Sequence, residues 1–74
     1  MQLVLEVEQE ADGRWLAEVV DLPGVLVYAA TAEAAAAAAK ALSLRVLADR
    51  IEHGELAPAD VSSLSFVQRE PLAV

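Results

Sequence analysis

The sequence predicts an α+β fold with two layers, a mixed four-stranded sheet and one long helix on one face. Three observations lead to this prediction. Apolar and polar residues alternate from the start, two glycine-containing turns reverse the chain early, and an alanine-rich run follows Thr31. The resulting order is β-β-β-α-β, and a right-handed crossover through the helix gives the strand order 3-2-1-4. With 74 residues, the chain is a single domain over residues 1–74.

The first two strands are predicted to form a hairpin. Apolar and polar side chains alternate through residues 2–10, with Val4 as the exception, which is typical of a strand with one covered face. We expect Asp12-Gly13 to supply the positive φ angles that a tight hairpin turn needs. Residues 14–20 then form the returning strand, with Trp15 as a core anchor.

The second turn is predicted at Pro23-Gly24. Proline presets φ for the first central position of a type II turn, and glycine accepts the positive φ of the second. Residues 25–29, Val-Leu-Val-Tyr-Ala, are then predicted to be the third strand. The apolar residues of this strand point to both faces, so we expect both faces to need a cover.

A long helix is predicted from the Thr31 cap to about His53. Threonine is a favourable N-cap, Glu33 suits the positive end of the helix dipole, and alanine has the highest helix propensity. Gly54 is expected to end the helix, and His53 to be a helix-terminal cation. A loop at 55–60 and a last strand at 61–69, ended by Pro71, complete the chain.

The predicted helix is more apolar than one sheet face can cover. On a helical wheel, two apolar arcs lie roughly half a turn apart. The first arc contains Ala35, Ala39, Leu42 and Val46, and the second contains Leu44, Leu47 and Ile51. The loop at 54–60 and the C-terminal tail offer one cover, but we expect a subunit interface. The candidate interface residues are Leu44, Leu47 and Ile51 on the helix, or Leu16 and Val20 on the outer sheet face.

Composition narrows the classes of partner. Apolar residues make up 57% of the chain, and cysteine is absent, so we expect a small core that is completed by homo-oligomerisation, as a dimer or tetramer. The net charge of −7 disfavours direct nucleic-acid binding, and favours either solubility alone or a basic partner.

The same composition bears on location and source. The first ten residues lack a basic region and no segment suits a bilayer, so the expected location is cytoplasmic, without a membrane partner. The lack of asparagine and cysteine is compatible with a thermophilic source or with a GC-biased genome.

No motif for catalysis, a metal or a cofactor stands out. The glycines are isolated, a Gly-x-Ser-x-Gly sequence is missing, and His53 is the single histidine. The layout matches the first half of a ribonuclease H-like fold, whose chemistry needs clustered acids that hold two metal ions. Glu6 or Glu8 and Glu33 could supply two acids, but Glu70 lies past the useful length of the fourth strand. We therefore expect a protein without enzymatic activity, metal or cofactor.

One set of residues carries a family resemblance. The set comprises Glu-Ala-Asp-Gly-Arg-Trp at 10–15, Ala-Glu-Val at 17–19, Asp-Leu-Pro-Gly-Val at 21–25, Tyr28 and Thr31. In these features the chain resembles the HicB-type antitoxins, over roughly residues 3–53. The resemblance implies a partial ribonuclease H fold without nuclease activity, a tendency to oligomerise, and a partner of the HicA type. That partner is a small basic toxin that cleaves messenger RNA, and the antitoxin binds and masks it.

The resemblance also sets a limit. Most HicB-type proteins add a C-terminal module that binds the operon's promoter, whereas this sequence stops just past the fourth predicted strand, so promoter binding is not expected. The expected function is a HicB-like antitoxin domain that masks its toxin sterically, with acidic side chains aiding encounter. Two alternatives stay open: a minimal metal-dependent nuclease, and a purely structural homo-oligomer without a toxin partner.

Overall fold

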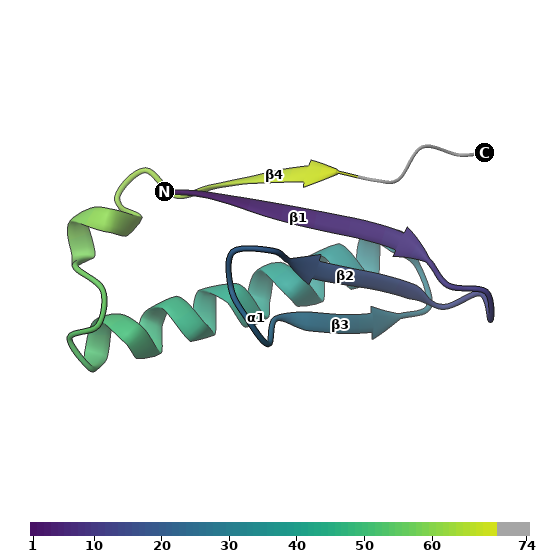
Figure 1. The fold of residues 1–74 in the computed structure, drawn as a ribbon, viewed down its shortest axis with the longest axis horizontal. Coiled ribbons are helices and arrows are strands. Elements are labelled where there is room, and N and C mark those ends of the chain that lie inside the picture. The colour runs from purple at the N-terminus through teal and green to yellow at the C-terminus, as the bar shows by residue number, and fades with distance from the viewer. Residues whose placement is uncertain (70–74) are drawn as a thin grey trace.

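A computed structural model describes residues 1–69, and the predicted terminator Pro71 lies outside them. Strands β1 (Gln2–Gln9), β2 (Trp15–Val19) and β3 (Leu26–Ala29) precede helix α1 (Ala32–Glu52). A 3-10 helix, η1 (Pro58–Val61), leads into β4 (Ser65–Arg69). The strands form one sheet in the order β3-β2-β1-β4, and α1 crosses one face of it (Figure 1). The predicted α+β fold and its strand order are confirmed.

The register fixes which side chains share a face. In the antiparallel pair β1–β2, Leu5 lies opposite Val19, and in the parallel pair β1–β4, Leu3 lies opposite Phe66. Leu3, Leu5 and Val19 are at most 2% exposed because they point toward α1. Their sequence neighbours therefore point to the other face of the sheet, since side chains alternate along a strand.

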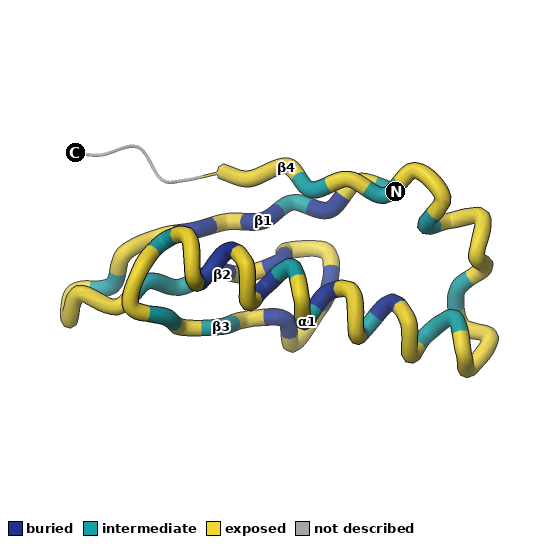
Figure 2. The backbone as a smooth tube through the Cα atoms, turned by 180° about the vertical axis from the view of Figure 1, so that it is seen from behind, coloured by how far each residue is buried: buried dark blue, intermediate teal, exposed yellow. Residues whose placement is uncertain are grey.

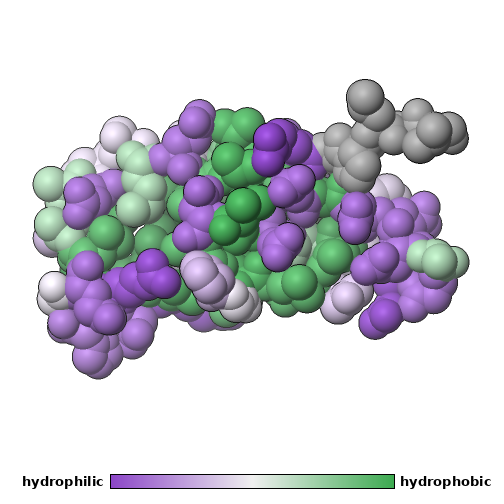
Figure 3. Space-filling view, viewed as in Figure 1, coloured by the Kyte–Doolittle hydropathy of each residue, from purple (hydrophilic) through white to green (hydrophobic). Residues whose placement is uncertain are grey.

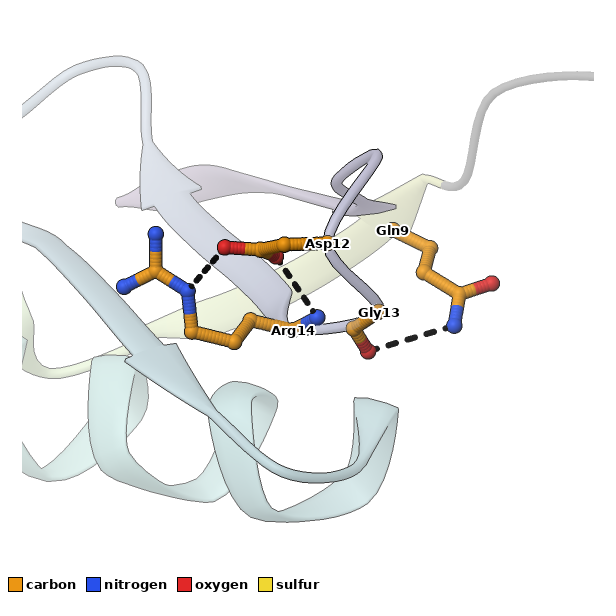
Figure 4. Close-up of polar contacts among 4 residues, drawn as sticks. All are labelled: Gln9, Asp12, Gly13 and Arg14. Carbon is orange, nitrogen blue, oxygen red and sulfur yellow. Dashed lines mark hydrogen bonds and ion pairs between the residues drawn. The ribbon is translucent and has the colours of Figure 1, made fainter.

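The hairpin between β1 and β2 differs from the prediction. Glu10 accepts a backbone bond from Gly13 at 3.0 Å and donates one to Arg14 at 2.7 Å, which makes residues 11–13 a three-residue loop. In such a loop a single residue takes the positive φ. That residue is Gly13, at 93°, so the expectation of a positive φ at Asp12 was wrong. The Asp12 carboxylate instead accepts bonds from Arg14, through its backbone N–H at 3.0 Å and its Nε at 2.7 Å (Figure 4).

The corner after β2 has the predicted backbone signature. Val25 donates its backbone N–H to Leu22 at 3.1 Å across Pro23, and φ of Gly24 is 90°. Asp21 adds a contact that the sequence did not reveal. Its Oδ2 accepts the backbone N–H of Val4 at 2.9 Å, and so takes the place of a carbonyl where β2 has ended.

Both helix ends follow the rules that predicted them. The Thr31 side chain accepts a bond from the backbone of Ala34 at 3.1 Å, the N-cap geometry. At the other end, Gly54 donates to Ile51 and Glu55 donates to Arg50, the bond pair of a Schellman cap with glycine at positive φ. His53 is the C-cap residue, so its helix-terminal position is confirmed.

Small side chains bring α1 close to the sheet. The buried residues of the helix are Ala35, Ala36, Ala39, Ser43 and Leu47. The Ser43 hydroxyl is satisfied because it donates to the carbonyl of Ala39 at 2.8 Å. Leu47 was expected on the surplus arc, but it is 3% exposed and belongs to the core. Leu44, from the same expected arc, is 51% exposed. Figure 2 shows buried and exposed positions alternating along α1.

The helix is longer than the sheet beneath it. Its 21 residues span about 31 Å, whereas a five-residue strand spans about 17 Å. Its C-terminal end therefore extends past β2 and β3, as Figure 1 shows. Within residues 1–69, no helix combines the length and apolar character that crossing a membrane requires.

The segment after α1 partly covers this overhang. The predicted loop contains the 3-10 helix η1, and the last strand begins at Ser65 rather than at residue 61. Leu56, Val61 and Leu64 are partly buried and pack against the core. The chain itself therefore covers part of the apolar surface of α1, as the sequence analysis gave as one alternative. The apolar surface left exposed on the helix is smaller than the helical wheel predicted.

Candidate protein-binding surfaces

The face of the sheet that points away from α1 is uncovered by the rest of residues 1–69. We call it the outer sheet face. Four of its apolar side chains are well exposed: Val20 at 51%, Tyr28 at 46%, Leu26 at 44% and Val67 at 37%. Figure 3 views the molecule from this side and shows apolar atoms across its middle, interrupted by polar ones. Its residues are Val4, Leu16, Val20, Leu26, Tyr28 and Val67, with Glu6, Glu8, Glu18 and Arg69.

These residues form rows across the strands. Val4 lies opposite Val67 in β4 and accepts a backbone bond from Val20, which makes one apolar row. Leu16 lies between Tyr28 in β3 and Glu8 in β1, in a second row that is apolar except at its β1 end. A charged row separates the two apolar rows: Leu26, Glu18, Glu6 and Arg69.

The charged row is electrostatically unbalanced. Glu6 and Glu18 are directly opposite each other, and like charges at such positions repel. Arg69 relieves Glu6, with its Nη2 at 3.6 Å from Glu6 Oε1. Glu6 lies between Arg69 and Glu18 in this row, so Arg69 does not reach Glu18. The Glu18 side of the row therefore keeps an uncompensated negative charge. A cation from another molecule would find a favourable position here.

The hairpin holds a second cation at the edge of this face. The Arg14 guanidinium lies 4.4 Å from the centroid of the Tyr28 ring and also pairs with Asp12. The backbone N–H of Arg14, and then its side chain, hold the pKa of the Asp12 carboxyl below its ordinary value. The Arg14 side chain thus packs on the Tyr28 ring, which stays half exposed.

A second apolar surface lies at the overhang of α1. It is an open groove of about 290 Å³ between the helix and the segment around η1. We call it the helix groove. It is lined by Leu44, Leu47, Ala48, Ile51, Val61 and Leu64.

The predicted interface residues divide between these two surfaces. Leu16 and Val20 lie on the outer sheet face, and Leu44, Leu47 and Ile51 line the helix groove. Leu47 is almost fully buried, so its side chain offers little area to a partner. Sequence reasoning missed Leu26 and Val67 as individual residues, and also Val61 and Leu64. Strand alternation around the charged row was the signal for Leu26 and Val67, whereas the groove depends on where η1 packs.

A further hollow of about 330 Å³ lies between the start of α1 and β4. Glu33, Lys40 and Gln68 contribute its polar side chains among alanines. The Lys40 ammonium lies 5.9 Å from the centroid of the Phe66 ring, at the outer limit of a cation–π contact. The hollow is open and has a single acid in its lining, so it offers no constellation for acid–base chemistry.

The acids considered for a nuclease site are not brought together. Glu6 and Glu8 lie on the outer sheet face, whereas Glu33 is on α1, which covers the opposite face. Among residues 1–69, no group of three His, Cys, Asp or Glu side chains is placed to hold a metal ion. Glu70 lies outside the described residues. His53 is at the far end of α1, with its Nδ1 at 2.7 Å from the carbonyl of Asp49.

Comparisons with protein families, with curated proteins and with solved structures found no match to this chain.

Proposed function

We infer that this protein is a non-catalytic protein-binding domain of the HicB-like antitoxin type, which masks a small basic toxin that cleaves messenger RNA. The observation that carries this proposal is the outer sheet face, where the two apolar rows flank the charged row with its excess of negative charge. The family part of the proposal rests on the resemblance at residues 10–31. The site geometry adds a surface of suitable chemistry.

The exposed apolar side chains of the outer sheet face supply the affinity. Full burial of a large apolar side chain contributes about 1.5–3 kcal/mol, so covering the exposed half of one contributes about 1 kcal/mol. Four such side chains, at Val20, Leu26, Tyr28 and Val67, give a gain of a few kcal/mol. Association entropy opposes this gain, so apolar contact alone gives a weak complex.

The charged row determines which kind of partner binds. A lysine or arginine from the partner, placed beside Glu18, replaces a repulsion with an attraction. Its aliphatic stem also packs on the neighbouring apolar rows. A second copy of this chain would instead bring two sets of Glu6 and Glu18 together on this face, which is unfavourable. The outer sheet face therefore suits a basic partner better than self-association.

The toxin is masked if the outer sheet face covers its RNA-binding surface. A toxin that cleaves RNA must present a basic surface to the phosphates. When the outer sheet face covers that surface, RNA is excluded sterically and its positive charge is neutralised. The net charge of −7 raises the rate of encounter with a basic protein, and this effect weakens as salt is added.

The test combines this protein with a small basic toxin of the HicA type and measures cleavage of labelled RNA. Wild-type protein is expected to stop cleavage at equimolar ratio. Glu18→Lys is expected to weaken the complex about tenfold or more, because the introduced lysine repels the basic partner. The control Glu55→Lys makes the same charge change on the exposed segment after α1 and should leave affinity within about twofold. Cleavage that continues at saturating wild-type protein contradicts the antitoxin role.

A further inference from the structure

Strand β3 is one of the two edges of the sheet, opposite β4 (Figure 1). Val25, just before β3, accepts a backbone bond from Val19 at 3.0 Å and therefore faces β2. Successive residues of a strand turn their N–H and C=O groups to opposite sides. This alternation turns the backbones of Leu26 and Tyr28 to the open edge. Within residues 1–69, no hydrogen bond reaches the backbone groups of either residue.

We propose that an extended segment of the basic partner adds to β3 as a fifth strand of the sheet. This inference rests on the proposed function and names the element of the partner that the protein recognises. A strand added at a sheet edge gains affinity from main-chain hydrogen bonds and specificity from alternate side chains. The Leu26 and Tyr28 backbones supply the donors and acceptors. Their side chains, 44% and 46% exposed, belong to the outer sheet face, so the added strand continues that face.

Charge distinguishes the β3 edge from the β4 edge. The charged row begins at β3 with Leu26 and the uncompensated Glu18, and ends at β4 with Arg69. A basic segment is therefore attracted to the β3 edge, whereas at the β4 edge it meets a cation. The sequence of β3, Leu-Val-Tyr-Ala, also contains no charged residue and no proline, which are devices that protect edge strands from pairing.

The side chains of β3 determine which residues the added strand needs. A residue opposite Leu26 lies two strand spacings, about 10 Å, from Glu18. A lysine or arginine at that position packs its aliphatic stem on Leu26 and brings its charge to Glu18. The residue opposite Tyr28 meets a ring that already holds the Arg14 guanidinium at 4.4 Å, so an uncharged apolar side chain suits this position. The recognised segment therefore has one basic and one apolar residue two positions apart, on the same face of the added strand.

Amide hydrogen exchange followed by NMR tests the added strand. In the free protein, the Leu26 and Tyr28 amides are expected to exchange fast, and the Val27 amide, which faces β2, to be protected. Binding of a small basic toxin of the HicA type is expected to slow exchange at Leu26 and Tyr28 by about tenfold or more. A complex in which both amides keep their free rates overturns the added strand and leaves the antitoxin role standing. Absence of any complex contradicts the antitoxin role, and this inference with it.

A pair of variants separates the backbone bond from the side chain. Leu26→Pro removes the edge N–H, and proline is tolerated where the missing N–H faces away from the sheet. The control Leu26→Ala removes the same apolar side chain but keeps the N–H. With the fold of each variant checked by circular dichroism, Leu26→Pro is expected to bind the toxin about fivefold more weakly than Leu26→Ala, because one hydrogen bond is lost.

Two results of these experiments would contradict pairing with the toxin at this edge. Equal affinity of the two folded variants would show that the Leu26 N–H forms no bond with the toxin. Protection of the Leu26 and Tyr28 amides that rises with protein concentration, without toxin, would assign the edge to a second copy of this chain. Either result overturns the proposal.

Discussion

Replacing Leu47 with alanine tests how α1 divides its leucines between the core and the solvent. Leu47 is 3% exposed and packs within the core cluster. Truncation of a buried leucine to alanine costs about 2–5 kcal/mol, from lost burial and from the cavity that is left. Leu47 also borders the open helix groove, so the site relaxes partly and the expected cost is about 2–3 kcal/mol.

The assay is thermal unfolding followed by circular dichroism at 222 nm, at a concentration low enough to keep the protein monomeric. In a domain of this size, 1 kcal/mol corresponds to about 4–8 °C in Tm, so Leu47→Ala should lower Tm by about 10–20 °C. Leu44→Ala is the matched control, because it is the same change on the same helix at a 51% exposed position. We expect it to stay within about 0.5 kcal/mol of wild type.

The comparison has a clear contrary result. Equal destabilisation by the two variants would show that Leu44 is as buried as Leu47 in solution, and would refute this assignment of the helix faces. A neutral Leu47→Ala would place Leu47 on the surface, as the helical wheel had predicted.

Three other predictions follow from local contacts. Asp21→Ala leaves the backbone N–H of Val4 without its partner at 2.9 Å and should cost about 1 kcal/mol in urea unfolding, whereas an unchanged midpoint would show that water replaces the carboxylate. Gly24→Ala forces a side chain into a φ of 90° and should cost about 1 kcal/mol or more by the same assay; a gain in stability would refute the turn geometry. The pKa of Asp12 is lowered in the folded state, so its contribution to stability is present at neutral pH and is lost as the pH falls through the folded pKa, below about pH 4. A carbon-detected NMR titration should show this pKa rising toward its ordinary value in Arg14→Gln, and an unchanged pKa would contradict the role of Arg14.

The sequence was most informative where one residue type satisfies one local requirement. Thr31 predicted the helix start because a hydroxyl at that position can accept an orphan N–H. Gly24 and Gly54 marked chain reversals because both sites need a positive φ. The strand order also followed from sequence, because two short turns and one helical crossover leave few ways to arrange four strands.

Other features depend on packing that no local pattern encodes. The Asp12-Gly13 pair is compatible with a two-residue or a three-residue loop, and backbone bonds of Glu10 decide between them. The helical wheel separates polar from apolar arcs, but it cannot tell where the sheet touches the helix. Because α1 packs across β1, β2 and β3, with β2 at the centre, Leu47 turned out to be core and Leu44 exposed.

The candidate surfaces were likewise predictable in part from sequence and in part set by packing. Strand alternation predicted an apolar outer sheet face around Leu16 and Val20, because a period of two assigns each side chain to a face. The rows that place Glu18 against Glu6 depend on the register between β1 and β2, which the sequence did not specify. The helix groove depends on η1, whose residues were predicted to be loop and strand.

The most direct test of the central claim is an NMR titration of the labelled protein with its basic partner, which reports the binding surface residue by residue. If the outer sheet face binds the partner, amide shifts will concentrate at the central rows of β1, β2 and β3, around Glu6, Glu18 and Leu26. Shifts confined to α1, or a spectrum that stays unchanged at saturating partner, would contradict the claim.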